Sequence, residues 1–339
     1  MTPSHLHYSK GTISIALVHE ALQAAQQQGV EIHAILTRAG IPLELMHSAK
    51  ARVSVLQYGQ LWIVLADAMN DEFFGMDSHP LRRGSYRLLS KWVYSADTVE
   101  TALKEILKFF NLILDDLRGE LQLNEDAAVL TLHDRAQPKA MFSYATYLML
   151  VHSLICWLSG QRIAIQKIEL KCPAPSDDAD YRVRFCENIC YEQPANRIYF
   201  DAQALGLKIK QDERSWKRFL QQTPYNLLVR FKNPHALSTM IRKQLMQRPP
   251  SEWLELHELT RQLNMSGATF QRRLKQEGTS YQQLKNEIRR DTAIELLSKT
   301  ELSLQDISER LNFHDPSAFH RAFKKWTGLN PGAYRQNQS

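Results

Sequence analysis

Apolar and polar positions near the C-terminus alternate with the spacing of short amphipathic helices. Leu304 to Leu311 reads as one such helix, because Ser303 and Asp306 form a capping-box pattern at its start. The three residues 312–314 follow as a turn. The pattern therefore predicts a helix that ends shortly before a second one begins.

Local residues indicate where the second helix begins and where it ends. Asp315 supplies an N-cap, Pro316 stands at the first helical position, and Gly328 can adopt the left-handed conformation that ends a helix. Between them, apolar residues recur every three or four positions and form one stripe that we expect to be buried: Phe319, Ala322, Phe323 and Trp326.

The opposite side of this helix is polar and basic. It carries Ser317, His320, Arg321 and Lys324, and no acidic residue occurs between Pro316 and Lys325. Such a face suits a helix in the major groove of DNA, where Arg and Lys contact base edges and phosphates. An ordinary amphipathic helix with a basic outer face is the alternative reading.

An internal repeat favours the DNA-binding interpretation. Leu263-Asn264 matches Leu311-Asn312, 48 residues further on, and an offset of 49 then aligns the next helix. The matched residues are Phe270, Arg272, Leu274 and Lys275 against Phe319, Arg321, Phe323 and Lys324. In the first copy Ser266 is the N-cap, and Ala268, Gln271, Arg272 and Lys275 point outward. We expect helix-turn-helix motifs at about 255–276 and 304–327.

A long helix is expected between the two copies, at about 281–298. At about 1.5 Å per residue its 17 or so residues span roughly 25 Å. Such a connector could hold two reading helices near one turn of B-DNA apart, about 34 Å. One chain could then read two successive major grooves.

The region from Leu237 to Arg335 resembles the DNA-binding domain of the AraC/XylS family of bacterial transcription regulators. The most specific part is Ile307 to Arg335, where the family's typical residues are in register: Phe313, Phe319, Phe323, Gly328, Pro331, Tyr334 and Arg335. The resemblance implies base-contacting positions at Ala268, Gln271, Arg272, Pro316, Ser317, Ala318, His320 and Arg321. We add Ser266, Lys275 and Lys324 to the predicted DNA-binding set.

The alanines in this set offer only methyl contact. Base readout is therefore expected to depend on Gln271, Arg272, His320 and Arg321.

The larger N-terminal region mixes helical and strand patterns, which predicts an α+β domain. The expected helices are Ile13–Gln28, Glu31–Ala39, Ser54–Asn70, Thr98–Leu112 and Tyr144–Ser159. The expected strands are Leu117–Leu123, Ala128–His133, Ile163–Lys171, Tyr181–Phe185 and Arg197–Phe200, and the first two flank a hairpin turn at 124–126.

This region resembles the N-terminal sensing domain of AraC-type regulators with an arabinose-binding-like domain, a subgroup that includes ornithine-utilisation regulators. The similar pieces are residues 29–42, 79–113 and 196–205. The resemblance implies sensing or dimerisation but does not imply arabinose as the ligand.

A ligand pocket could lie between two apolar helices, Leu103–Leu114 and Tyr144–Leu158. The candidate ligand-binding residues are Phe110, Tyr144, Tyr147 and His152, with Arg82 and Arg83 to pair with a carboxylate. Plain core packing explains the same aromatic residues.

Charge and length support two domains. Residues 240–339 hold 16 Lys and Arg against 11 Asp and Glu, a net of +5, whereas residues 1–239 hold 26 against 25, a net of +1. We expect a sensing domain at 1–210, a linker helix region at 211–235 broken at Thr223-Pro224, and an all-α DNA-binding domain at 236–339.

The sequence gives little support for a secreted, membrane-spanning or metal-binding protein. The N-terminus lacks the apolar core of a signal peptide, and the apolar stretch Met141–Leu158 is interrupted by polar residues, so we expect a cytoplasmic protein without a membrane span. Four cysteines, Cys156, Cys172, Cys186 and Cys190, lack zinc-ligand spacing, and no metal or cofactor is expected.

We therefore expect a sequence-specific transcription regulator, not an enzyme. Its expected partners are a double-stranded DNA operator, RNA polymerase, a small-molecule effector, and a second copy bound through the N-terminal domain. One alternative is a regulator without a ligand, controlled by oligomerisation or abundance. A remote alternative is a DNA-repair alkyl transferase with a nucleophilic cysteine.

Overall fold

The computed structural model describes residues 11–124, 127–228, 237–277 and 279–335. Contacts within the chain divide it into two compact units. One, here the sensing unit, contains Ala16–Ala39 and Tyr58–Phe231. The other, the DNA-binding unit, contains Met1–Ile15, Gly40–Gln57 and Lys232–Ser339. The predicted boundaries at 210 and 236 differ from this division, because two N-terminal segments group with the C-terminal helices.

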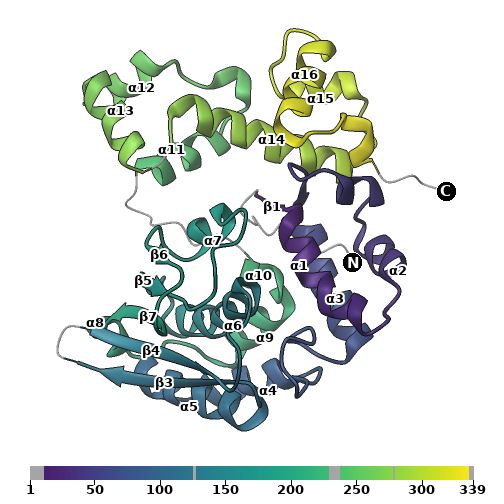
Figure 1. The fold of residues 1–339 in the computed structure, drawn as a ribbon. Coiled ribbons are helices and arrows are strands. Elements are labelled where there is room, and N and C mark those ends of the chain that lie inside the picture. Colours follow the sequence, from purple (N-terminus) through teal and green to yellow (C-terminus); the bar gives the residue numbers. More distant parts are fainter. Residues whose placement is uncertain (1–10, 125–126, 229–236, 278, 336–339) are drawn as a thin grey trace. The chain divides into compact units, whose positions relative to one another are not determined.

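The sensing unit contains a five-stranded sheet in the order β3-β4-β7-β5-β6 (Figure 1). Its strands are β3 Leu117–Leu123, β4 Ala127–Asp134, β5 Ile165–Glu169, β6 Ile189–Cys190 and β7 Asn196–Asp201. All described pairings are antiparallel except that of β5 with β6. The expected β3–β4 hairpin is confirmed, with Leu121 opposite Leu130. Glu125 and Asp126 of its predicted turn lie outside the described residues.

Helices supply much of the core of the sensing unit. They are α1 Ile15–Gln27, α2 Ile32–Ala39, α3 Val55–Met69, α4 Ser85–Val93, α5 Val99–Ile113, α6 Met141–Ser159, α7 Ala179–Arg184, α8 Ala202–Leu205, α9 Glu213–Gln222 and α10 Tyr225–Leu228. Of these, α5 and α8 pack directly against strands of this sheet. Helix α6 is long and apolar enough to cross a membrane, but 89% of its most apolar window is buried inside the protein. It is the core helix that its polar interruptions predicted.

Two local predictions for this region were wrong. Tyr181–Phe185 is not a strand, because residues up to Arg184 form α7, in which Tyr181 and Arg184 are buried one helical turn apart. The helix expected from Ile13 begins at Ile15, because Thr12–Ser14 forms β1 and pairs with β2 at Arg52–Ser54. The predicted break at Thr223-Pro224 is confirmed, since α9 ends before it and α10 begins after it.

The DNA-binding unit is mainly helical, as predicted. Its helices are α11 Leu237–Met246, α12 Leu256–Gln262, α13 Gly267–Gln276, α14 Tyr281–Lys299, α15 Leu304–Arg310 and α16 Pro316–Thr327. Short 3-10 turns are η1 Leu43–His47, η2 Pro250–Glu252 and η3 Pro331–Tyr334. In Figure 1, α14 joins the α12–α13 pair to the α15–α16 pair.

Candidate nucleic-acid interface

The first helix-turn-helix is formed by α12 and α13. The carboxylate of Glu258 accepts a hydrogen bond from the backbone N–H of Glu255 at 3.0 Å, which secures the start of α12. Ser266 Oγ then accepts from Thr269 N at 3.2 Å and caps α13. Between the helices Asn264 takes a left-handed conformation with φ of 50°. Asparagine tolerates this conformation better than most residues.

The second helix-turn-helix, α15 and α16, has the predicted caps. Ser303 Oγ and the Asp306 carboxylate each accept the other's backbone N–H at 3.0 Å. Asp315 Oδ1 accepts from Ala318 N at 2.7 Å. Gly328 ends α16 with φ of 77°. These contacts confirm the helix boundaries expected from the sequence.

The two motifs repeat in three dimensions as well as in sequence. Asn312 is left-handed like Asn264, with φ of 57°. Met265 N donates to the carbonyl of Thr260 at 3.0 Å, and Phe313 N donates to that of Ser308 at 3.1 Å. Equivalent turns therefore hold α13 and α16 against their supporting helices.

Aromatic and aliphatic side chains bury one face of each second helix. Phe270 and Leu274 of α13 are buried, and so are Phe319 and Phe323 of α16. Ala322 and Trp326, which the sequence placed in the same stripe, are only half-buried. The buried faces fix which side of each helix points outward.

The predicted DNA-binding residues lie on the outward faces. Nine of them are exposed: Ser266, Ala268, Gln271, Arg272, Lys275, Pro316, Ser317, Arg321 and Lys324. Ala318 and His320 are half-buried. Among the described residues, no carboxylate forms a salt bridge with Arg272, Lys275, Arg321 or Lys324. These exposed basic side chains have the charge that the predicted contacts to phosphates and base edges require.

The connector α14 is braced against both motifs by Arg289. Its guanidinium carbon lies 5.2 Å from the centre of the Trp253 ring and 5.6 Å from that of Phe313. Arg289 Nε also donates to the carbonyl of Leu311 at 3.1 Å. A single side chain thus contacts the residues in front of α12, the end of α15 and the turn before α16. Sequence reasoning missed this brace.

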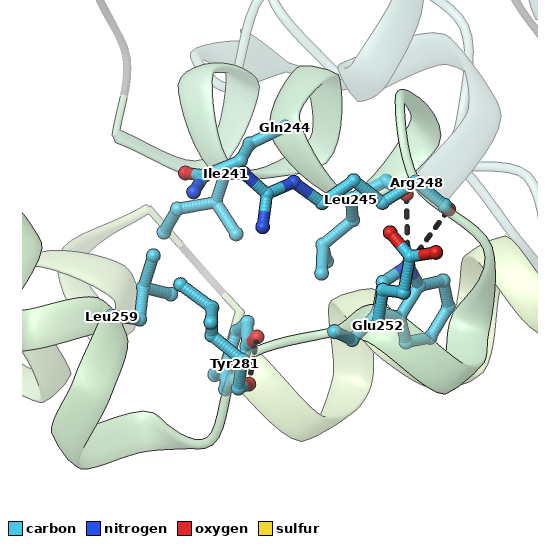
Figure 2. Close-up of a pocket in the computed structure, with 9 residues that line it drawn as sticks. Ile241, Gln244, Leu245, Arg248, Glu252, Leu259 and Tyr281 are labelled. Atoms are coloured by element: carbon cyan, nitrogen blue, oxygen red, sulfur yellow. Dashed lines mark hydrogen bonds between the residues drawn. The ribbon is translucent and has the colours of Figure 1, made fainter.

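Hydrogen bonds hold the residues just before the first motif against α11 and α14 (Figure 2). Trp253 Nε1 donates to the carbonyl of Leu245 at 2.8 Å, and Tyr281 Oη donates to that of Leu254 at 2.7 Å. The space between these side chains is only about 10 Å³, roughly the space of one water molecule. It is a packing gap between α11, α12 and α14, too small for an organic ligand.

Two N-terminal segments complete the DNA-binding unit. Thr12 Oγ1 of β1 donates to Asp291 Oδ1 of α14 at 2.7 Å. Ser48 Oγ donates to the carbonyl of Thr327 at the end of α16 at 2.9 Å. These partners are 279 residues apart, so no local sequence signal could have revealed the contacts.

The predicted ligand-binding residues fall in two settings. Phe110, Tyr144, Tyr147 and His152 are all buried in the core of the sensing unit. The rings of Phe110 and Tyr147 lie 5.0 Å apart, and Tyr144 Oη donates to Asp134 Oδ1 at 2.7 Å.

Arg82 and Arg83 lie at the surface of the sensing unit. Arg82 is exposed. Arg83 lies within salt-bridge distance of Asp67 and Glu72, at 2.6 and 3.2 Å. Burial opposes its charge, but these two carboxylates raise the pKa of Arg83 above its usual value. Its charge is already balanced by the protein, and a ligand role for it stays a prediction.

Three of the four cysteines are held as neutral thiols, including Cys156, whose Sγ lies 3.4 Å from His152 Nε2. Burial raises the pKa of Cys156 and raises those of Cys172 and Cys186 to about 11, so these thiols stay protonated at neutral pH. No group of three or more His, Cys, Asp or Glu side chains in the described part of the chain could hold a metal ion.

Two family models match this chain. The arabinose-binding domain of AraC transcription regulators matches residues 29–209, and a helix-turn-helix domain matches residues 259–337. The ornithine utilization regulator of Pseudomonas aeruginosa is 25% identical over 341 residues, which covers 98% of each chain.

Solved structures give a weaker likeness. The transcriptional regulator CdpR of Pseudomonas aeruginosa is 19% identical, with 98% of this chain and 100% of that chain covered and a TM-score of 0.30. The C-terminal domain of AraT from Geobacillus stearothermophilus is 30% identical, with 32% and 94% covered and a TM-score of 0.29.

Since the first model alone covers more than half of the chain, the family is shown, and the second model covers the end of α12 and all of α13 to α16. Members of the family are transcription regulators and not enzymes. The chain is an AraC-family transcription regulator, with a DNA-binding helix-turn-helix domain and an N-terminal sensing domain.

Proposed function

We propose that this regulator binds one operator through α13 and α16 together and reads two successive major grooves. The observation that carries the proposal is the repeated geometry, in which each reading helix is capped, buried on one face and exposed on its basic face. Helix α14, with 19 residues, spans roughly 28 Å at about 1.5 Å per residue. That length suits a separation near one turn of B-DNA, about 34 Å.

Base selection is assigned to Gln271, Arg272, His320 and Arg321. Amide side chains pair with adenine and guanidinium groups pair with guanine in the major groove. Lys275 and Lys324 then contact phosphates, and these contacts make the affinity dependent on salt.

Selection of binding sites from a random DNA pool tests this proposal. The expected product is an asymmetric site with two conserved blocks about one helical turn apart. Arg272→Ala and Arg321→Ala should each weaken binding to that site by about 1 to 3 kcal/mol and relax one block only. Arg118→Ala, on the exposed side of β3, is the matched control. Equal affinity of all three variants for the selected site rules the proposal out.

We also propose that a small molecule bound to the sensing unit controls the regulator. The protein is proposed to act in the cytoplasm, with RNA polymerase as its partner at the promoter. The sensing-domain match supports this role without naming the effector. The 25% identical relative is named as an ornithine utilization regulator, so L-ornithine is one effector to test.

A homodimer through the sensing unit is the remaining partner proposed. Leu88 and Trp92, one turn apart on α4, are 70% and 52% exposed. Large exposed apolar side chains of this kind mark contact surfaces. Sedimentation of the full chain should give a dimer, and Leu88→Glu should shift it towards monomer. A parent chain that sediments as a monomer at every concentration excludes this partner.

A further inference from the structure

A hollow of about 130 Å³ lies in the sensing unit, where α3, α4 and α6 meet the turn between α9 and α10. Its lining comes from three regions that are distant in sequence, residues 62–86, Leu150 and residues 223–227. The lining residues that matter below are Trp62, Ala66, Phe74, Tyr86, Leu150 and Leu227.

The walls of this hollow are mostly apolar. The rings of Trp62 and Phe74 meet edge to face, 4.9 Å apart. Leu150, Pro224 and Leu227 add aliphatic surface. An enclosed apolar cavity of about 150 Å³ takes up benzene, and this hollow, which is open to solvent on one side, has nearly that volume. The size and lining of this hollow therefore fit a molecule of one ring.

The charged and hydroxyl groups of the lining already have partners. The Glu72 carboxylate accepts from Gly84 N at 2.9 Å and from Tyr86 N at 2.8 Å, besides its salt bridge to Arg83. Tyr86 Oη donates to the carbonyl of Leu150 at 3.1 Å, and Thr223 Oγ1 donates to that of Phe219 at 2.9 Å.

A charged ligand would therefore find no unpaired counter-charge among the described lining residues. A neutral ligand would not have to displace any of these contacts. Burying a carboxylate or an ammonium group here would be costly, because the only buried polar side-chain atom of the lining without a partner in the described residues is the N–H of Trp62.

One wall of the hollow belongs to α10, which is held in place from two sides. Gly59 of α3 lets the Tyr225 ring approach so closely that an added Cβ would lie 2.5 Å from it. Buried Arg184 donates to the carbonyl of Leu227 at 2.8 Å. Burial lowers the pKa of Arg184 to about 10, so it remains protonated at neutral pH. A molecule that packs against Leu227 therefore acts on a segment with a defined position.

We propose that this hollow is the effector site and that it binds a neutral, apolar, single-ring molecule. The regulatory consequence rests on the function proposed above, whereas binding itself does not. A bound ring packs against Leu227 of α10. The hollow is thus assigned a ligand class.

Calorimetric melting of the full chain with indole and toluene tests the assignment, in the absence of DNA. Each probe should raise the Tm of the parent progressively with probe concentration, because it binds only the folded state. Ala66→Phe fills the hollow and should abolish the rise. Ala68→Phe adds the same ring to an exposed position of α3 outside the lining and should keep it. If Ala66→Phe does not fold, Ile63→Phe, at a half-buried lining position, replaces it.

Three outcomes overturn the proposal. The first is a parent Tm that stays constant up to the solubility limit of both probes. The second is a rise that persists in the folded, ring-filled variant. The third is a larger rise with benzoate or L-ornithine, which would assign a charged ligand. Selection of DNA sites by the probe-free parent is a separate measurement, so a failed operator proposal and a failed ligand site give different results.

Discussion

Arg289 Nε donates a hydrogen bond of 3.1 Å to the carbonyl oxygen of Leu311, the residue that ends the supporting helix of the second motif. The same guanidinium lies within cation–π distance of Trp253 next to the first motif and of Phe313 in the second. A planar group that contacts all three positions fixes the spacing of the two reading helices more firmly than α14 alone could.

Replacing Arg289 should therefore affect two-groove binding more than single-motif folding. We expect Arg289→Ala to lower the free energy of unfolding by about 1 to 3 kcal/mol, because a charge-assisted hydrogen bond and two cation–π contacts are lost. Arg289→Lys should recover only part of this, since an ammonium group cannot stack as a plane. Denaturant unfolding and anisotropy titrations with one-block and two-block DNA sites measure the two effects.

The role of Arg289 as a brace is contradicted if Arg289→Ala binds one-block and two-block sites with the same affinities as the parent. Equal losses on both site types would also contradict it, because they would indicate general damage to the motifs.

The left-handed asparagines of the two turns support a second prediction. Asn264→Ala and Asn312→Ala should each destabilise the DNA-binding unit by about 1 kcal/mol. Both residues have a positive φ, and alanine tolerates that conformation less well than asparagine, whose polar side chain can form local hydrogen bonds. Glycine at either position should be neutral or slightly stabilising. Asn286→Ala, inside α14, is the control and should not destabilise. Thermal unfolding of the parent and the five variants checks the order, and an alanine variant as stable as its glycine counterpart contradicts it.

The helix-turn-helix pair could be predicted from sequence because its signals are local. The cap of α16 depends on Asp315 and Ala318, three residues apart, and its end depends on Gly328 alone. The identity of neighbouring residues therefore decides where these helices begin and end. The family resemblance added a prediction of which outward positions contact DNA.

Other parts of the fold depend on partners far away in sequence. Strand β1 exists because Thr12–Ser14 pairs with Arg52–Ser54, and by pattern alone Ile13 looked like the start of α1. The hollow of the sensing unit joins Trp62 to Leu227, which no periodicity connects. Short apolar runs such as Tyr181–Phe185 also fit a strand and a helix equally well, and tertiary packing decided for the helix.

Buried His152 supports a prediction about pH. Its Nε2 lies 2.7 Å from the carbonyl of Ile163, and its Nδ1 has no partner among the described residues. Burial first, and then the positive charge of Arg184, lower the pKa of His152 to about 3. A histidine in the unfolded chain has a pKa near 6.5. At a pH between these two pKa values, the unfolded state binds one more proton than the folded state.

Stability should therefore fall as pH falls from about 7 towards 3, and this contribution should level off below the folded pKa. The slope attributable to His152 is about 1.4 kcal/mol per pH unit. His152→Asn should be less stable than the parent at pH 7. Because the variant lacks the titrating imidazole, its free energy of unfolding should not show this part of the pH dependence. Urea unfolding at several pH values compares the two chains, and parallel pH profiles would show that His152 does not titrate on unfolding.

The contact between Gly328 and Ser48 supports the last prediction, which concerns the N-terminal segment of the DNA-binding unit. A Cβ on Gly328 would lie 2.4 Å from Ser48 Oγ, and Gly328 has φ of 77°. Gly328→Ala should therefore cost the strain of a left-handed residue, about 1 to 2 kcal/mol, and the steric conflict in addition. Ser48→Ala removes the hydroxyl and costs about 1 kcal/mol for its hydrogen bond to the carbonyl of Thr327.

A double-mutant cycle separates these effects. In the Ser48→Ala background, Gly328→Ala should cost only the backbone strain, so the two changes together should cost at least about 0.5 kcal/mol less than their sum. Gly29→Ala is the matched control, since Gly29 has φ of 76° with no atom within 4 Å of an added Cβ. Its cost should not change with Ser48→Ala. If the Gly328 and Ser48 changes prove additive, the Ser48 hydroxyl does not restrict the space beside residue 328, and the proposed steric conflict is wrong.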